Sequence, residues 1–247
     1  MDGHWPYLPL LFVPSPLDWA SHVYFLLIAL VLLLRGLMPV SPHWYVRLLR
    51  EFLLVAPAAL FYFAVRGLVD AREAVAFGNA RQVIDLERAL NIYWEPGLQG
   101  LIIGSDLLVN IVNWIYIWAH WPVLIATLLW LVVARHDRYA TYRNAVLLSG
   151  AIGILIFAVY PVAPPRLMPD VELLDTVTLR SQSYRVLQPP ALANPHAAMP
   201  SLHFGWNLIV SIAVVRESRT LVGRLLGYTM PAAMFVGVVF TANHYIL

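Results

Sequence analysis

Two histidines and one arginine lie at the ends of long apolar runs, where packing gives no reason for such side chains. His203 lies at the start of the sixth run, His244 near the end of the seventh and Arg166 just beyond the fifth. Cleavage of a phosphate ester by in-line attack needs a nucleophile, an acid for the leaving oxygen and positive donors around the other oxygens. Imidazole suits the first two tasks near neutral pH, and guanidinium suits the third. Together with Ser201 and the free amides of a helix start, these residues predict phosphoryl transfer that needs no metal.

The lengths of the last two runs indicate that these side chains meet at one face of a membrane. At 1.5 Å per residue, about 24 Å of helix separates His203 from a turn near Arg219, and about 37 Å separates that turn from His244. With tilt, both histidines reach the same leaflet boundary. Up-and-down threading brings Arg166 to that boundary as well.

The composition is that of an integral membrane protein. Of the 247 residues, 60% are apolar and only 12% are charged, whereas soluble domains carry about 25% charged residues. The absence of cysteine excludes disulfides, thiolate catalysis and cysteine-ligated metals. All basic residues are arginine, which excludes Schiff-base chemistry, and a net charge of +2 is too small to indicate nucleic-acid binding.

Seven apolar runs of about 15 to 22 residues approach the ~20 that a helix needs to cross a bilayer. They predict an all-α polytopic bundle with six to seven transmembrane helices, because the short fourth run pairs with the third as a hairpin or tilts. Residues 67–98 mix charged and apolar side chains at helical spacing, which predicts an amphipathic interfacial helix. We expect one membrane domain, with N-terminal helices over residues 1–98 and a catalytic bundle over 99–247. The runs are 20–38, 50–66, 100–118, 120–134, 144–163, 200–215 and 222–246.

Arginine counts in the predicted loops give an orientation. Ten arginines fall on one side of the bundle and six on the other, so the positive-inside rule places the N-terminus in the cytoplasm. The long proline-rich loop 164–199, which could build a lid, then faces outward, and we expect the plasma (inner) membrane as the location. The ten are Arg66, Arg72, Arg81, Arg88, Arg135, Arg138, Arg143, Arg216, Arg219 and Arg224; the six are Arg35, Arg47, Arg50, Arg166, Arg180 and Arg185.

Three short motifs resemble those of a known family. Pro200-Ser201-Leu202-His203 is similar to the Pro-Ser-Gly-His motif of the type 2 phosphatidic acid phosphatase superfamily, in the Ser-Leu-His form of the inositol phosphorylceramide synthase branch. Asn243-His244-Tyr245 resembles the start of that family's third motif, and Ala163-Pro164-Pro165-Arg166 resembles the first. The resemblance spans about residues 160–247.

The resemblance implies a role for each matching residue. His244 would be the nucleophile that forms a phosphohistidine, His203 the acid that protonates the leaving alkoxide, and Arg166 the cation that stabilises the phosphoryl oxygens. It implies a lipid phosphate as substrate, water or a small alcohol such as inositol as acceptor, surrounding membrane lipids as partners and no cofactor. We expect further substrate contacts from Ser201, Asn243, Tyr245, His120 and Arg185.

Several positions depart from the family pattern. The first motif has no lysine, Val238 replaces the arginine six residues before the third-motif histidine, and Leu202 replaces glycine. Arg185, Arg180 or Arg143 would have to supply the missing phosphate donors. The family's orienting aspartate, four residues after that histidine, falls just beyond Leu247, so we expect either a natural chain that continues with this acid or a substitute. The candidate substitutes are Asp170, Glu172 and Asp175.

Other interpretations remain open at the level of sequence. His120 beside Trp121 could be an interfacial anchor, and Arg166 could anchor a helix end at the headgroups. The histidines could relay protons in a proton-coupled transporter or lie in a lipid-binding bundle without catalysis, although the paired acids and repeats expected of a transporter are not found. A catalytically inactive scaffold is a third alternative. Two ionisable side chains at matching depth favour the enzyme, because such groups are costly within spans and usually functional.

Overall fold

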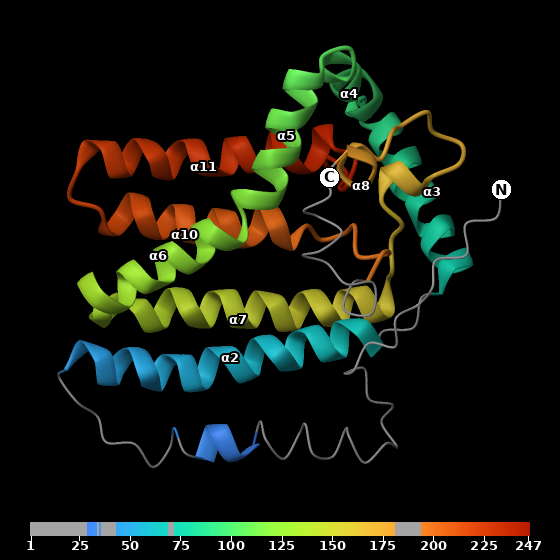
Figure 1. The fold of residues 1–247 in the computed structure, drawn as a ribbon. Helices are drawn as coiled ribbons and strands as arrows, with labels where there is room; N and C mark the ends of the chain where they lie inside the picture. Colours follow the sequence, from blue (N-terminus) through green and yellow to red (C-terminus); the bar gives the residue numbers. More distant parts are fainter. Residues whose placement is uncertain (1–28, 34, 36–42, 69–71, 181–193) are drawn as a thin grey trace. The chain divides into compact units, whose positions relative to one another are not determined.

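The computed structural model describes residues 29–33, 35, 43–68, 72–180 and 194–247. In this part of the chain the regular structure is helical, with a single isolated β-bridge between Val162 and Ala197. The predicted all-α class is therefore confirmed (Figure 1). The helices are α2 (Trp44–Leu68), α3 (Glu73–Ala89), α4 (Glu95–Ile103), α5 (Asp106–Trp118), α6 (Trp121–Ala134), α7 (His136–Val159), the 3₁₀ turn η1 (Pro165–Leu167), α8 (Thr176–Arg180), α10 (Leu202–Glu217) and α11 (Leu221–Phe240).

The chain divides into two units. The first contains residues 1–68 and 189–194, with α2 as its long helix, and the second contains residues 69–188 and 195–247. The run predicted at 50–66 lies within α2, and most of the run predicted at 20–38 lies outside the described residues. The domain boundary expected at residue 98 stays a prediction. All residues of the candidate site that are described belong to the second unit.

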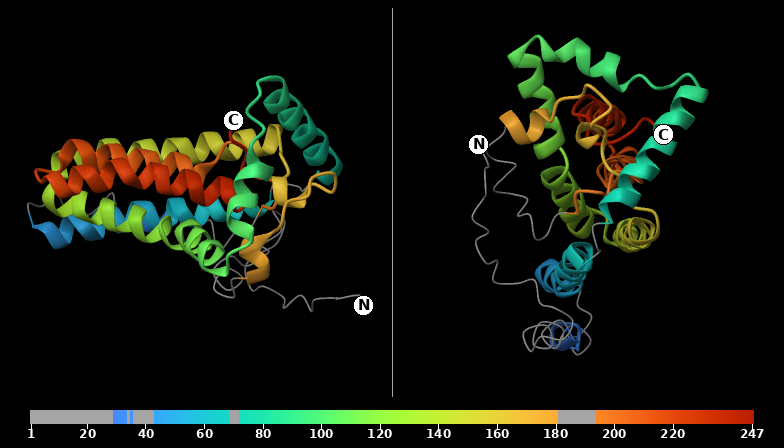
Figure 2. Two further views of the ribbon diagram at one scale, coloured as in Figure 1. Left: turned by 90° about the horizontal axis from the view of Figure 1, so that it is seen from above. Right: turned by 90° about the vertical axis from the view of Figure 1, so that its right-hand side faces the viewer.

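Helices α7, α10 and α11 lie side by side and form the centre of the second unit. Gly227 of α11 permits close approach to α10, because a Cβ there would lie 2.6 Å from Val215 Cγ2 and 3.1 Å from the Ser211 carbonyl oxygen. Small residues at helix contacts have this role in membrane bundles. In the end-on view of Figure 2, α3, α4 and α5 frame the ends of α10 and α11.

Two described helices, α7 and α11, are long and apolar enough to cross a membrane. Helices α5 and α6 would make a third span if taken together, and they meet at a bend of 41°. The bend corresponds to the tilt expected for the fourth run rather than to a hairpin. The predicted number of six to seven crossings is not confirmed.

Helix ends differ from the apolar runs at two places. The run 100–118 is broken where α4 ends at Ile103 and Ser105 caps α5 by accepting a hydrogen bond from Leu108 N at 3.4 Å. The last helix ends at Phe240 instead of continuing through His244. Polar residues lie at both places, Ser105 and Asp106 at the first and Thr241, Asn243 and His244 at the second, but a hydropathy average over a whole run does not resolve them.

Helix α3 has the predicted amphipathic character and covers the C-terminal end of α7. Its buried face includes Ala76, Ala80 and Val83, and the Ala76 carbonyl accepts a hydrogen bond from Ala163 N at 3.1 Å. The side chains of Arg72 and Asn79 donate to carbonyls at the end of α7 and just beyond it. These donors satisfy carbonyls that a helix end leaves without intrahelical partners.

Candidate active site

His203 is placed by the first turn of α10. Ser201 is the N-cap residue, and its Oγ accepts a hydrogen bond from Phe204 N at 3.3 Å, as expected of serine at this position. The serine predicted to bind substrate therefore also begins the helix. The half-buried His203 ring stacks on Tyr116 of α5, with centroids 4.8 Å apart and planes inclined by 23°.

A tight reversal after α11 places His244. Ala242 N donates to the Val239 carbonyl, and Asn243 N and His244 N both donate to Val238 O at 3.1 Å. Ala242 adopts a φ of 54°, in the left-handed region where helix termini of this kind usually have glycine. The buried Asn243 side chain donates to Thr241 Oγ1 at 2.8 Å, so this predicted substrate contact helps to hold the turn.

These two turns and the bend between α5 and α6 bring three imidazoles together. The ring centroids of His203 and His244 lie 5.7 Å apart, and those of His120 and His203 lie 4.3 Å apart. His120 comes from the bend between α5 and α6, and its ring stacks on Trp206 with planes inclined by 8°. Segments widely separated in sequence thus supply adjacent rings with acid–base capacity.

A backbone carbonyl orients the His244 ring. His244 Nδ1 lies 2.7 Å from the Ala198 carbonyl oxygen. Because a carbonyl can only accept, Nδ1 carries the proton in this pair, and the lone pair of a neutral ring is on Nε2. Ala198 is in turn held by a hydrogen bond from its own amide to the Val162 carbonyl at 3.1 Å. Neither this carbonyl nor the Tyr116 stack could be identified from sequence, since a backbone acceptor leaves no signal in residue type.

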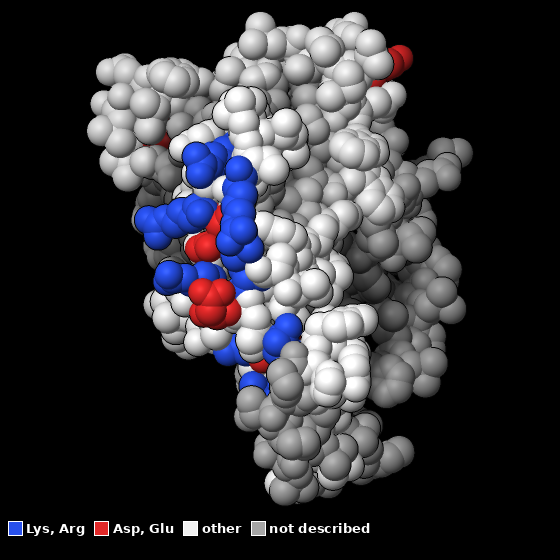
Figure 3. All heavy atoms as spheres, turned by 90° about the vertical axis from the view of Figure 1, so that its left-hand side faces the viewer, with Lys and Arg blue, Asp and Glu red and all other residues white. Residues whose placement is uncertain are grey.

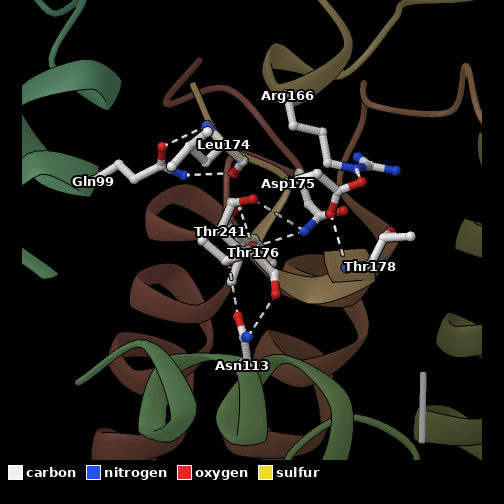
Figure 4. A network of polar contacts seen from close by, with 10 residues as sticks. Gln99, Asn113, Arg166, Leu174, Asp175, Thr176, Thr178 and Thr241 are labelled. Carbon is white, nitrogen blue, oxygen red and sulfur yellow. Dashed lines mark hydrogen bonds and ion pairs between the residues drawn. The ribbon is translucent and has the colours of Figure 1, made fainter. Parts of the chain in front are cut away.

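Arg166 lies next to the histidine turn and is paired with a carboxylate. Its backbone N donates to Ala242 O at 3.0 Å, and its Nε donates to Asp175 Oδ2 at 3.1 Å. Asp175 directly precedes helix α8 and accepts a hydrogen bond from Thr178 N at 2.9 Å, so the first turn of that helix fixes the acid (Figure 4). Among the acids considered as substitutes for the orienting aspartate, Asp175 thus pairs with Arg166. Asp170 pairs with Arg81 at 2.8 Å.

Two side-chain amides attach this acidic segment to the bundle (Figure 4). Asn113 Nδ2 of α5 donates to the Thr176 carbonyl, and Thr176 Oγ1 donates to Asn113 Oδ1, both at 2.9 Å. Gln99 of α4 makes a similar pair of bonds with the backbone of Leu174, at 3.0 and 2.8 Å. Residues 174–176 are therefore docked on α4 and α5, and this fixes the carboxylate that holds Arg166.

The remaining predicted site residues have distinct placements. Tyr245 is buried, and its hydroxyl donates to the Ala163 carbonyl at 2.8 Å. Burial, followed by the nearby carboxyls Glu87 and Glu95, raises its pKa, so the hydroxyl remains a donor. Arg143 contacts Asn144 near the opposite end of α7 and does not join the site. Arg185 lies outside the described residues.

The fold and the site define a class: an all-helical membrane protein whose paired imidazoles lie beside an arginine at one end of the bundle. Comparison with known protein families matches residues 81–247 to the PAP2 superfamily, and the chain belongs to this superfamily. Its members are phosphatases and phosphotransferases that act on phosphate esters. No curated protein and no solved structure matches the chain. The superfamily resemblance is confirmed, while the inositol phosphorylceramide synthase branch stays a prediction.

Proposed function

We propose that the protein is a membrane phosphatase or phosphotransferase that acts on a lipid-linked phosphate through a phosphohistidine on His244. The observation that carries the proposal is the approach of the His203 and His244 rings to 5.7 Å, with His244 Nδ1 bonded to Ala198 O. That bond leaves Nε2 with the lone pair that a nucleophile needs.

The proposed reaction has two displacements at phosphorus. In the first, His244 Nε2 attacks, the ester P–O bond breaks and His203 gives a proton to the departing alkoxide. In the second, the oxygen of water or an alcohol attacks phosphorus, the P–N bond to His244 Nε2 breaks and the attacking group gives its proton to His203, which restores both rings. Arg166 and the amides at the start of α10 would bind the phosphoryl oxygens.

The surface of the bundle supports a lipid substrate. Exposed apolar side chains cover the half of α7 nearer the histidines, among them Ile152, Leu155 and Val159, and Phe235 in the second half of α11 is exposed as well. A molecule whose tail lies among such side chains presents its phosphate at the ends of the helices, where the imidazoles lie. The Ser-Leu-His motif favours transfer to an alcohol such as inositol, and water is the alternative acceptor.

The distribution of arginine supports an active site that faces away from the cytoplasm. The turns that precede α7 and α11 lie at the end of the bundle opposite the histidines, and this end carries Arg135, Arg138, Arg143, Arg216, Arg219 and Arg224. The sequence predicts Arg72, Arg81 and Arg88 on that same side, but they lie with α3 at the histidine end, so the predicted count of ten against six is wrong. The positive-inside rule assigns the two arginine-rich turns to the cytoplasm. In a bacterial inner membrane or a plasma membrane, the imidazoles would then lie at the outer leaflet.

The test is to incubate the purified chain with a phospholipid labelled on its phosphate, with and without inositol. We expect free labelled phosphate from hydrolysis or a new labelled lipid from transfer, and a transient acid-labile label on the peptide that contains His244. His136→Ala, an exposed histidine at the start of α7, is the matched control. Full turnover by His244→Ala would contradict the proposal and favour a transporter or binding protein.

A further inference from the structure

Two buried glutamates hold the backbone that follows His244. Glu87 near the end of α3 and Glu95 at the start of α4 are both 0% exposed. Glu87 Oε1 accepts hydrogen bonds from the amides of Ile246 at 2.9 Å and Leu247 at 3.1 Å. Glu95 Oε1 accepts a second bond from the same Ile246 amide at 3.0 Å.

Ionisation of both carboxyls at once would be unfavourable in free energy. Two carboxylates that share a donor and lie out of water repel one another strongly, and one remains protonated. In the part of the chain that the structure describes, neither carboxyl has a salt bridge. The other ionisable groups that face the pair are the hydroxyls of Tyr93 and Tyr245, with the Arg88 guanidinium 4.9 Å above the Tyr93 ring.

We propose that Glu87 and Glu95 share one proton and act together as a positioning pair for His244. The proposal rests on the proposed function of that histidine. The segment is held at three successive places: the His244 ring by Ala198 O, the Tyr245 hydroxyl by Ala163 O, and the following amides by the two carboxyls. Loss of the last attachment frees the backbone two residues from the nucleophile, and misplacement by about 1 Å costs roughly 100-fold in rate.

The shared proton gives the pair a defined pH dependence. Burial, and then the charge of Glu95, raise the pKa of Glu87 from 4.5 to about 8. The folded chain therefore keeps a proton that the unfolded chain releases in this range. The contribution to stability is complete below pH 4.5 and is lost as the pH rises to about 8. Ionisation of both carboxyls separates the pair and loosens the amides of residues 246 and 247.

The experiment compares Glu87→Gln, Glu87→Ala and the control Asp85→Asn in the full chain. Glutamine can accept from the amides and donate to Glu95, and so mimics the protonated acid. We expect Glu87→Gln to keep kcat within about threefold of the wild type at neutral pH and to move the alkaline limb of the pH–kcat profile to higher pH. Glu87→Ala should lower kcat about tenfold or more with little change in KM. Asp85 is exposed on the same helix, and its replacement should leave kcat and the pH profile unchanged.

Infrared spectroscopy detects the shared proton without any turnover. The wild type should show a carboxylic-acid C=O band at neutral pH that titrates with a midpoint of about 8, and Glu87→Gln should lack it. Absence of that band, its persistence in Glu87→Gln, an unchanged alkaline limb or equal losses in the glutamine and alanine variants would overturn the proposal. If His244→Ala were fully active, the function would fail, while the band would still report on the pair.

Discussion

The two ends of the α7, α10 and α11 bundle differ in the exposure of their polar groups: at one end they lie at the surface, and at the other they are buried. At the end shown in Figure 3, arginine side chains gather at the surface beside a few acids. At the other end, the imidazole of His244, the amide of Asn243 and the carboxyls of Glu87 and Glu95 are buried. The exposed members of the first group are Arg138, Arg216, Arg219 and Arg224.

The difference lies in how strongly each group depends on its neighbours. At the basic end, Arg138 Nε lies 3.4 Å from Asp137 Oδ2, and both side chains are exposed. Surface contacts of this kind contribute little, because water replaces them when they are lost. At the site end, a buried polar group that loses its partner is left unsatisfied, which costs about 1–3 kcal/mol. Equal chemical changes at the two ends should therefore have unequal effects.

The largest contrast is expected between two histidines. His244→Ala should lower kcat at least about a thousandfold, because removal of a nucleophile eliminates the covalent route. His136→Ala, at the basic end, should leave kcat within about twofold, as surface changes usually do. Release of phosphate from a lipid phosphate measures both. A small loss of kcat in His244→Ala would show that His244 is not the nucleophile.

Two aspartates of one loop give the next contrast. Asp175→Asn should raise KM about tenfold, because Arg166 loses the charged partner that orients its guanidinium. Asp170→Asn removes an exposed pair with Arg81 and should change KM less than twofold. Initial rates over a range of substrate concentrations distinguish the two. Equal responses would show that Asp175 does not position Arg166.

A moderate effect is expected where α7 meets the start of α10. A Cβ on Gly153 would lie 3.0 Å from both terminal carbons of Leu202, the residue next to His203. Gly153→Ala should therefore displace Leu202 and lower kcat by a few fold. Leu202→Ala in the same chain should restore it. Gly78→Ala, where a Cβ meets nothing within 4 Å, is the control, and a loss that Leu202→Ala fails to restore would contradict the contact.

The smallest effect is expected at the turn between α10 and α11. Arg219 is exposed there. Arg219→Gln should leave kcat and KM within about twofold, because an exposed charge distant from the reacting groups is screened by water and salt. Steady-state kinetics in detergent provide the measurement. A tenfold loss would mean that the basic end influences the chemistry.

Much of the fold could be predicted from the sequence because apolar runs are long and helical caps are local. Ser201 and Thr220 begin α10 and α11, and the intervening lengths return both helices to the same end. Ser105 is a cap of the same local kind and marks the break after Ile103. The break after Phe240 could not be predicted in this way, because it depends on the reversal at Ala242, which places an alanine where the local rule favours glycine.

The candidate site was predictable only where side-chain type carries the signal. The proximity of His203 and His244 follows from motif positions and helix lengths, although their catalytic roles stay predictions. The pairing of Arg166 with Asp175 required the loop to dock through Asn113, and nothing in the spacing of those residues indicates it. The buried pair of Glu87 and Glu95 could not be predicted from the sequence, because both belong to a segment whose alternating charges predict a surface helix.

The orientation of the His244 ring is resistant to mutation, because the acceptor is the main-chain carbonyl of Ala198. Every amino acid has a main-chain oxygen, so no codon change at position 198 can delete the acceptor as it could delete an aspartate. A substitution elsewhere disturbs this contact only if it displaces the backbone segment that carries the oxygen. That segment is held to Val162 by the β-bridge and by the hydrogen bond from Ala198 N. Backbone ester substitution at the amide of residue 199 would weaken the oxygen as an acceptor while every side chain stays in place.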